Sequence, residues 1–275
     1  MIKVAAIQMV SGTDVKKNLL RASYWIRQAA SQGAGLIVLP ENFCLLESRQ
    51  LLELGAQETD EMGLVRAELA ALAKANKVWL VAGSLPCTGR PDGSFIADRV
   101  RSVSWVYNDA GECVARYDKI HLFDVDVEDG YGTYRESVLV EAGDQLTTVD
   151  TPFGKVGLSI CYDLRFPELY RELVNQGAEI LVCPAAFTFK TGEAHWDVLL
   201  RARAIENQAF MIAANQGGRH SDQRETYGHS MIVNPWGVVL ASQEASGEGL
   251  VMAELNLKQQ QQVRKAMPVL SHRRV

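Results

Sequence analysis

Short apolar runs alternate with longer segments of helical periodicity along this chain. The first run covers residues 3–7, and further runs follow at residues 36–39, 78–81, 156–160, 180–183 and 210–213. Runs of this length are typical of buried strands, and the periodic segments between them are typical of helices that cover a sheet. The alternation predicts a layered α/β fold.

The alternation occurs twice. Residues 32–40 resemble residues 176–184, and in both copies a helix is expected to end at a glycine and a strand at a proline. Residues 105–111 and 231–237 are each a β run broken by Asn-x-x-Gly, which predicts a hairpin. One such match can arise by chance, but several in the same order indicate two pseudo-duplicated halves. We expect two sheets packed face to face with helices outside, a four-layer α-β-β-α sandwich.

The two halves are separated by an insertion. The second half begins near residues 151–155, so the insertion runs from Lys119 to about residue 150. It is polar and rich in turn residues, and its acidic and glycine positions are Asp124, Asp126, Glu128, Asp129, Gly130 and Gly132. A loose calcium loop is one interpretation, but the spacing differs from the helix-loop-helix calcium pattern. We therefore expect a solvated loop beside an active site and no metal.

Composition limits the class of protein. With 275 residues, of which 47% are apolar and 22% charged, the chain is long enough for one globular domain or two fused halves. We expect one domain over residues 1–275. The net charge of -5 and the lack of a long basic run argue against a nucleic acid partner.

The N-terminus and the cysteines bear on location. The chain enters its first predicted strand directly, and no apolar run approaches membrane-spanning length, so we expect a cytoplasmic protein without a membrane partner. The five cysteines are odd in number and scattered, with no C-x-x-C pair. This pattern suggests neither disulfides nor a zinc site.

Cys161 lies between an apolar strand and a predicted helix start at Pro167 and Glu168. A thiolate is expected to be stabilised there, at the positive end of the next helix, although such a cysteine is more often an inert core residue. Glu41 follows a buried strand directly, and Lys119 follows the first hairpin. Each of these two, taken alone, is more simply a solvated side chain.

Together the three residues supply what amide hydrolysis needs. Cys161 can attack the carbonyl, Glu41 can take the thiol proton and return it to the leaving amine, and Lys119 can stabilise the oxyanion. The backbone N–H of Tyr162 can serve as a second oxyanion donor. Water activated by Glu41 would then hydrolyse the thioester.

The motifs around these residues resemble the nitrilase, or carbon-nitrogen hydrolase, superfamily. They are Leu-Pro-Glu at 39–41, Tyr-Asp-Lys-Ile-His-Leu at 117–122 and Ile-Cys-Tyr-Asp-Leu-Arg-Phe-Pro-Glu at 160–168. The resemblance extends over nearly the whole chain and implies a Glu41-Lys119-Cys161 catalytic triad and no cofactor. It also implies that Glu136 lies beside the lysine and helps position the substrate and the triad, with a plain loop glutamate as the alternative. Family members usually form dimers, which implies at least a homodimer.

Motifs in the second half are similar to the branch of this superfamily that hydrolyses deaminated glutathione. They cover residues 194–206, 218–220 and 227–237. The resemblance implies a metabolite-repair amidase that releases 2-oxoglutarate and cysteinylglycine. Arg165 is placed to bind a substrate carboxylate, and Phe187 and Thr188 are placed to line the pocket. The alternatives are an ω-amidase acting on 2-oxoglutaramate or 2-oxosuccinamate and a catalytically silent binding or scaffold protein.

Overall fold

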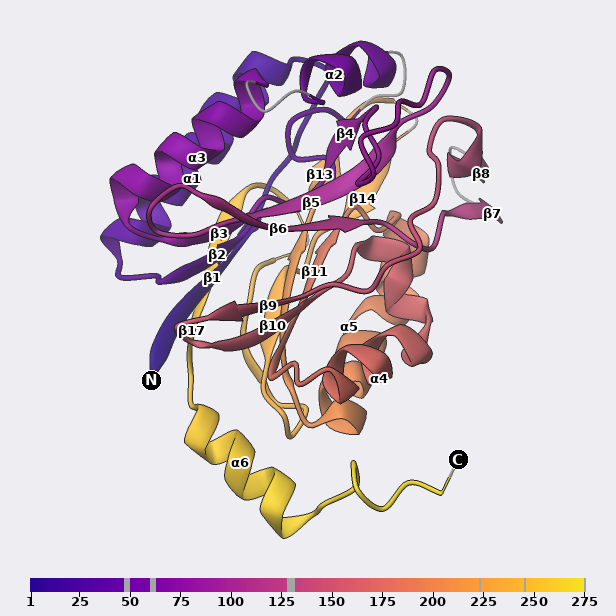
Figure 1. The fold of residues 1–275 in the computed structure, drawn as a ribbon. Coiled ribbons are helices and arrows are strands. Elements are labelled where there is room, and N and C mark those ends of the chain that lie inside the picture. The colour runs from indigo at the N-terminus through magenta and orange to yellow at the C-terminus, as the bar shows by residue number, and fades with distance from the viewer. Residues whose placement is uncertain (47–49, 60–62, 128–131, 223, 245, 275) are drawn as a thin grey trace.

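The structure is a computed structural model that describes residues 1–274 except 47–49, 60–62, 128–131, 223 and 245. Two β-sheets lie face to face, and helices cover their outer faces (Figure 1). Helices α1 (Val15–Ser31) and α3 (Leu64–Asn76) cover the first sheet, and α4 (Pro167–Asn175) and α5 (Phe189–Asn207) cover the second. The predicted four-layer α-β-β-α sandwich is confirmed.

The first sheet contains seven strands among the described residues, in the order β17-β1-β2-β3-β5-β4, with β6 also paired to β5. Strands β1, β2 and β3 run parallel, and β5 and β6 are antiparallel to their neighbours. The strands are β1 (Ile2–Gln8), β2 (Leu36–Val38), β3 (Trp79–Val81), β4 (Leu85–Cys87), β5 (Arg101–Tyr107), β6 (Cys113–Asp118) and β17 (Gly249–Leu255).

The second sheet contains six strands among the described residues, in the order β16-β15-β12-β11-β10-β9. Strands β10, β11 and β12 run parallel, and β15 and β16 are antiparallel to their neighbours. The strands are β9 (Thr148–Thr151), β10 (Gly154–Leu158), β11 (Ile180–Ala185), β12 (Phe210–Asn215), β15 (Met231–Val233) and β16 (Val239–Ser242).

Three parallel strands followed by an antiparallel hairpin therefore occur in both sheets, which confirms the predicted pseudo-duplication. One detail of the prediction is wrong. Strand β11 does not end at Pro184 but continues to Ala185, and both residues are in register with β12. A proline is tolerated at a position where the ladder does not need its missing N–H. In the first half the corresponding strand β2 ends at Val38, two residues before Pro40.

The ends of the helices follow from local chemistry. The Asp14 side chain caps α1 by accepting a 2.9 Å hydrogen bond from the Lys17 N–H. Pro167 is the first residue of α4, where a missing N–H is harmless. Gly177 follows this helix with a φ of 97°, which a residue with a side chain rarely adopts.

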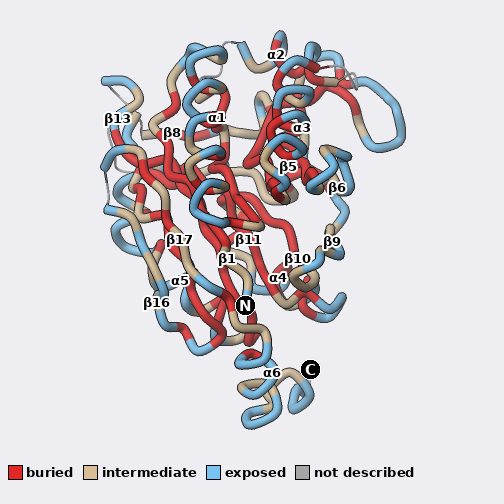
Figure 2. The backbone as a smooth tube through the Cα atoms, turned by 90° about the vertical axis from the view of Figure 1, so that its left-hand side faces the viewer, coloured by how far each residue is buried: buried red, intermediate tan, exposed pale blue. Residues whose placement is uncertain are grey.

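The buried apolar residues form two clusters, and the first of them also packs α4 and α5 against the second sheet. One cluster fills the space between the sheets and includes residues from both of them, such as Val4 and Val38 from the first and Val156 and Val182 from the second. The other cluster packs α1 and α3 against the outer face of the first sheet. Figure 2 shows the buried strands at the centre of the molecule and exposed residues along the outer helices. Since the sheets share a core, loops at the ends of their strands are held in a fixed relation.

The remaining elements lie at the edges of the sandwich. Helix α2 (Leu51–Gln57) lies near β4, and α6 (Leu257–Ala266) extends away from the opposite end of the molecule (Figure 1). Among the described residues, none of the helices combines the length and apolar character that crossing a membrane requires.

The insertion between the halves contains more regular structure than the expected loop. Residues Asp124–Asp126 (β7) and Thr133–Arg135 (β8) form a two-stranded ribbon, and Glu136–Val138 form a short 3-10 helix, η1. The residues Glu128, Asp129 and Gly130 of the calcium-loop interpretation lie outside the described residues. A second ribbon, β13 (Gly217–Arg219) with β14 (Glu225–Tyr227), follows the second sheet.

Candidate active site

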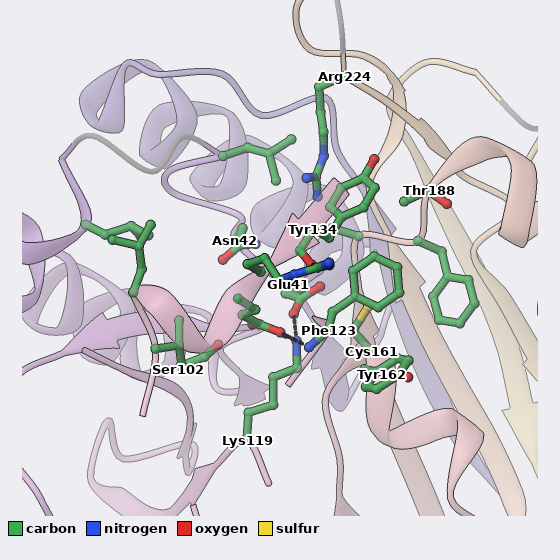
Figure 3. Close-up of a pocket in the computed structure, with 18 of the residues that line it drawn as sticks. Glu41, Asn42, Ser102, Lys119, Phe123, Tyr134, Cys161, Tyr162, Thr188 and Arg224 are labelled. Atoms are coloured by element: carbon green, nitrogen blue, oxygen red, sulfur yellow. Dashed lines mark hydrogen bonds and ion pairs between the residues drawn. The ribbon is translucent and has the colours of Figure 1, made fainter. Parts of the chain in front are cut away.

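A cavity of about 490 Å³ opens where strands from both sheets end. Glu41 follows β2, Lys119 follows β6, and Cys161 follows β10. All three side chains line this cavity (Figure 3). Glu136, from the insertion, lines it too. The structure thus brings together residues that are far apart in the sequence.

Lys119 is held between two carboxylates. Its ammonium group donates a 2.7 Å hydrogen bond to Glu41 Oε1 and 2.9 Å hydrogen bonds to both carboxylate oxygens of Glu136. Glu136 Oε2 also accepts a 2.7 Å hydrogen bond from the Phe123 N–H. Only 2% of Lys119 is exposed, so this is a desolvated network rather than a surface ion pair.

The charges of this network support one another. Burial by itself lowers the pKa of the Lys119 ammonium, but the carboxylates of Glu136 and Glu41 outweigh burial and hold that pKa well above its ordinary value. Burial raises the pKa of the Glu136 carboxyl, although the charge of Lys119 opposes this effect. The lysine is therefore a permanent cation beside the cavity at neutral pH.

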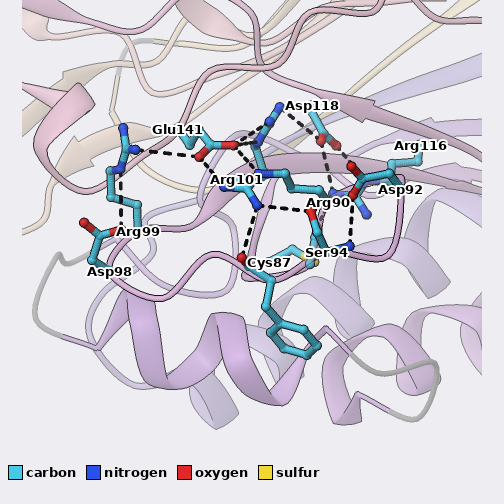
Figure 4. Close-up of polar contacts among 12 residues, drawn as sticks. Cys87, Arg90, Asp92, Ser94, Asp98, Arg99, Arg101, Arg116, Asp118 and Glu141 are labelled. Atoms are coloured by element: carbon cyan, nitrogen blue, oxygen red, sulfur yellow. Dashed lines mark hydrogen bonds and ion pairs between the residues drawn. The ribbon is translucent and has the colours of Figure 1, made fainter.

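A second polar network lies next to Lys119 in the sequence and holds the end of strand β6. Glu141 accepts hydrogen bonds of 2.7 and 2.8 Å from Arg90 and of 3.0 and 2.6 Å from Arg101 (Figure 4). Arg101 also lies 3.6 Å from Asp118, the residue before the lysine. Through these contacts the end of β6 is fastened to the segment that follows η1.

Cys161 occupies a strained position. It begins η2 (Cys161–Arg165), a 3-10 turn between β10 and α4, with a left-handed φ of 48°. The carboxylate of Asp163 stabilises this turn by accepting hydrogen bonds from the Ile160 N–H at 2.8 Å and from the N–H of His121 at 3.1 Å. The His121 ring also lies 2.8 Å from this carboxylate, through Nδ1. The sulfur is thereby aimed into the cavity, as Figure 3 shows.

The expectation of a stabilised thiolate is wrong for the resting site. Burial, reinforced by the carboxylate of Glu41, raises the pKa of the Cys161 thiol well above its ordinary value, and the charge of Lys119 offsets only part of this rise. The sulfur therefore keeps its proton at neutral pH. A reaction through this cysteine needs a base to accept that proton.

All four residues predicted to bind substrate line the cavity: Tyr162, Arg165, Phe187 and Thr188. The Arg165 guanidinium lies over two aromatic rings, 5.8 Å from the centre of Tyr162 and 5.2 Å from that of Phe187. The Phe187 N–H donates a 3.0 Å hydrogen bond to the Asn215 side chain, which fixes the start of the loop between β11 and α5. The wall of the cavity is therefore partly aromatic and partly cationic.

The sequence analysis missed several residues of the cavity. Asn42 follows Glu41 with a φ of 54° and donates its N–H to Ser84 Oγ at 2.9 Å. Tyr134 lies on β8, two residues before Glu136, and its closeness in sequence to that residue could have indicated it. Arg224, from the loop between β13 and β14, also lines the cavity, and no local signal indicated it.

Glu41 is tied to the second half of the molecule by a buried contact. Gln216, between β12 and β13, donates 3.0 and 2.9 Å hydrogen bonds to the Glu41 carbonyl and to Ser11 Oγ. Ser11 Oγ in turn donates to the Phe43 carbonyl at 2.7 Å.

Within the described ranges, no cluster of three or more His, Cys, Asp or Glu side chains is arranged to hold a metal ion.

The chain is similar to known proteins over almost its whole length. The family model for carbon-nitrogen hydrolases matches residues 3–265. A protein of Yersinia enterocolitica named deaminated glutathione amidase is 41% identical over 98% of this chain and 92% of its own length. A Synechocystis protein of the same name is 45% identical over 98% of this chain and 97% of its own.

A solved structure is also similar. The Caenorhabditis elegans NitFhit protein superposes with a TM-score of 0.88 and is 38% identical, with 99% of this chain covered. The chain spans 65% of the length of that protein.

Proposed function

This chain belongs to the carbon-nitrogen hydrolase family and is a hydrolase that acts on amides, and we propose that it hydrolyses deaminated glutathione to 2-oxoglutarate and cysteinylglycine. The observation that carries this proposal is identity of 41% and 45%, over 98% of the chain, to amidases named for that substrate. Deaminated glutathione carries two carboxylates, which arginine and lysine side chains bind well. The cationic part of the cavity wall, which includes Arg165, therefore supports the proposal.

In the proposed reaction Cys161 is the nucleophile and Glu41 is the base. Glu41 takes the proton from the thiol as the sulfur attacks the amide carbon, and the oxyanion forms beside the Lys119 ammonium and the Tyr162 N–H. Glu41 then donates this proton to the amide nitrogen as the C–N bond breaks. The dipeptide leaves and the acyl group stays on the sulfur as a thioester.

Water completes the cycle. Glu41 takes a proton from a water molecule as its oxygen attacks the thioester carbon, and the C–S bond then breaks. The sulfur takes back a proton from Glu41, and 2-oxoglutarate is released. The raised pKa of the Cys161 thiol supports a mechanism in which the base acts at the moment of attack. The role proposed for Glu136 is to hold Lys119, which its two 2.9 Å contacts support.

The test is hydrolysis of deaminated glutathione and of 2-oxoglutaramate in parallel, with Cys161→Ala as the blank. Cys113→Ala is the matched control, because Cys113 is exposed and lies outside the cavity. Strong preference for deaminated glutathione, lost in Cys161→Ala and kept in Cys113→Ala, is the expected result. Preference for 2-oxoglutaramate would instead identify an ω-amidase, and no turnover of either would refute the proposed substrate.

We further propose that the reaction needs no cofactor and that residues 1–275 act as one domain of this family. The catalytic groups proposed above are all side chains and backbone of this chain, and the family match spans residues 3–265. Activity is therefore expected to survive exhaustive treatment with a chelator. Loss on chelation with rescue by a metal ion would contradict this.

We also propose a homodimer. Val198 of α5 and Trp236 of the β15–β16 turn are 65% and 61% exposed, and the two elements are joined by a 2.9 Å hydrogen bond from Arg201 to the Gly237 carbonyl. Large exposed apolar patches often mark protein–protein interfaces, and these two exposed side chains support an interface at α5 and this turn. Light scattering is expected to give a dimer for the wild type and a monomer for the Val198→Glu, Trp236→Glu double variant. A monomeric wild type would contradict the proposal.

A cytoplasmic location and the absence of a nucleic acid partner belong to the same proposal. The five free cysteines support a reducing compartment. The net charge of -5 supports the absence of a nucleic acid partner. Cell fractionation and a nucleic acid binding assay at low salt test them.

A further inference from the structure

One wall of the cavity is a row of aromatic rings with a guanidinium group at each end. The ring of Phe123 lies 5.0 Å from that of Tyr134 and 5.1 Å from that of Tyr162. Arg224 lies 5.2 Å from the Tyr134 ring centre, and Arg165 lies 5.8 Å from that of Tyr162. The three rings therefore connect the two arginines through a continuous series of contacts.

The two arginines reach the cavity from different elements. Arg165 lies four residues after Cys161 in the same 3-10 turn. Arg224 lies in the β13–β14 hairpin, and Gln216 at the base of this hairpin donates a 3.0 Å hydrogen bond to the carbonyl of Glu41. Figure 3 shows the Arg224 side chain reaching into the cavity toward Tyr134 and Glu41. Arg224 therefore enters the cavity beside Tyr134 and Glu41, and Arg165 belongs to the turn that carries Cys161.

The hairpin is held in place by a half-buried histidine. His220 lies between the Ser11 carbonyl, 2.7 Å from Nδ1, and Thr226 Oγ1, 2.6 Å from Nε2. Burial, together with the charge of Arg224, lowers the pKa of His220 to about 4, although the hydrogen bond to the Ser11 carbonyl opposes this shift. The ring is therefore neutral at physiological pH. These contacts keep the wall that carries Arg224 in a fixed position.

The charge of the cavity favours an anionic substrate. Its described lining carries four basic side chains and two carboxylates, namely Lys119, Arg135, Arg165 and Arg224, and Glu41 and Glu136. Both carboxylates are already bonded to Lys119. Arg135 is bonded to Asp126 at 2.9 Å on the exposed ribbon. Arg165 and Arg224 are the basic groups at the two ends of the aromatic row.

We propose that Arg224 binds the terminal carboxylate of the leaving peptide and so selects substrates whose leaving group is an acid. In the proposed reaction Glu41 protonates the departing nitrogen, so the leaving group lies on the Glu41 side, where Arg224 is. A planar guanidinium can hold a carboxylate through two parallel hydrogen bonds. The inference rests on the proposed function, because deaminated glutathione carries one carboxylate on each side of its amide.

The test compares three substrates: deaminated glutathione, its C-terminal amide, and 2-oxoglutaramate, whose leaving group is ammonia. For Arg224→Gln, kcat/KM for deaminated glutathione is expected to fall about 10- to 100-fold, mainly through KM. For the other two substrates it is expected to stay within about threefold, since neither has the carboxylate that Arg224 binds. Arg165→Gln is expected to lower kcat/KM for all three substrates.

The matched control is Arg219→Gln, an exposed arginine on the same hairpin that does not line the cavity. It is expected to leave all three rates unchanged, and Arg224→Lys is expected to recover part of the loss. An equal loss on the acid and the amide, or no loss on the acid, would overturn the role of Arg224 while the proposed function stands. If the wild type does not hydrolyse deaminated glutathione, both the function and this subsite are refuted.

Discussion

The hydroxyl group of Tyr117 donates a 2.7 Å hydrogen bond to the buried carboxylate of Asp163. Tyr117 is on β6, two residues before Lys119, and Asp163 is two residues after Cys161. This contact therefore connects the turn that carries the proposed nucleophile with the strand that carries the proposed oxyanion partner. The relative position of the thiol and the ammonium group depends on it.

Tyr117→Phe removes this donor and leaves the Asp163 carboxylate with fewer partners. Because the acceptor is charged and buried, we expect a loss of about 1.5 to 3 kcal/mol in the free energy of unfolding. Urea unfolding measures it. Tyr24→Phe is the control, since Tyr24 is 46% exposed and its loss of a hydroxyl should change little. Equal stability of the two variants would refute the importance of the contact.

Glu136→Gln tests the second glutamate. The amide cannot supply the charge that holds Lys119, so kcat is expected to fall about 100-fold or more with a smaller change in KM. Glu254→Gln, an exposed glutamate on β17, is the control. Steady-state kinetics with unchanged kcat for Glu136→Gln would show that this residue is an ordinary loop glutamate.

The same residue gives a pH dependence. Burial raises the pKa of Glu136, so this carboxyl gains its proton at a higher pH than an ordinary glutamate, whose pKa is about 4.3. As the pH falls through the raised pKa, Lys119 loses one of its anionic partners. The activity is therefore expected to fall with decreasing pH on a limb above about pH 4.3, and a pH-rate profile measures it. A limb at or below the ordinary value would contradict the assignment.

Much of this architecture could be predicted because it depends on local patterns of apolar and polar residues in the sequence. The loops that deliver Glu41, Lys119 and Cys161 each follow a strand and each carry a continuous motif, so their meeting where strands of the two sheets end followed from the predicted sandwich. Arg224 could not be found in this way. Its place depends on Gln216 bonding to Ser11, a residue 205 positions away in the sequence. The resting protonation of Cys161 was also missed, because burial depends on the packing of both sheets.

Gly83→Ala is expected to damage the Glu41 loop. Gly83 has a φ of 55°, and an added Cβ would lie 2.1 Å from the carbonyl oxygen of Pro40, next to Glu41. Both the left-handed backbone and the collision disfavour alanine, so we expect a loss of at least about 2 kcal/mol in stability together with lower activity. Gly12→Ala, where nothing lies within 4 Å of the added atom, is the control for both measurements.

Glu141 gives stability a pH dependence of its own. Hydrogen bonds from Arg90 and Arg101 lower the pKa of Glu141 to about 2, below the value of about 4.3 expected in the unfolded chain. The stability from this carboxylate is present above the unfolded pKa and is lost as the pH falls toward the folded one. The difference in unfolding free energy between wild type and Glu141→Gln is expected to shrink from pH 7 to pH 3. A difference that is equal at pH 7 and pH 3 would contradict this role of Glu141.

The left-handed backbone conformation of Cys161 lowers the stability of the fold at the position that the reaction needs. A φ of 48° is unfavourable for cysteine and nearly free of strain for glycine, so Cys161→Gly should relieve strain at the turn while removing the thiol. The sulfur thus occupies a position that the backbone alone would assign to another residue. A descendant of this chain that no longer needed the reaction would be free to replace the cysteine with glycine. Selection for hydrolysis, renewed in each generation, is what would keep the sulfur there.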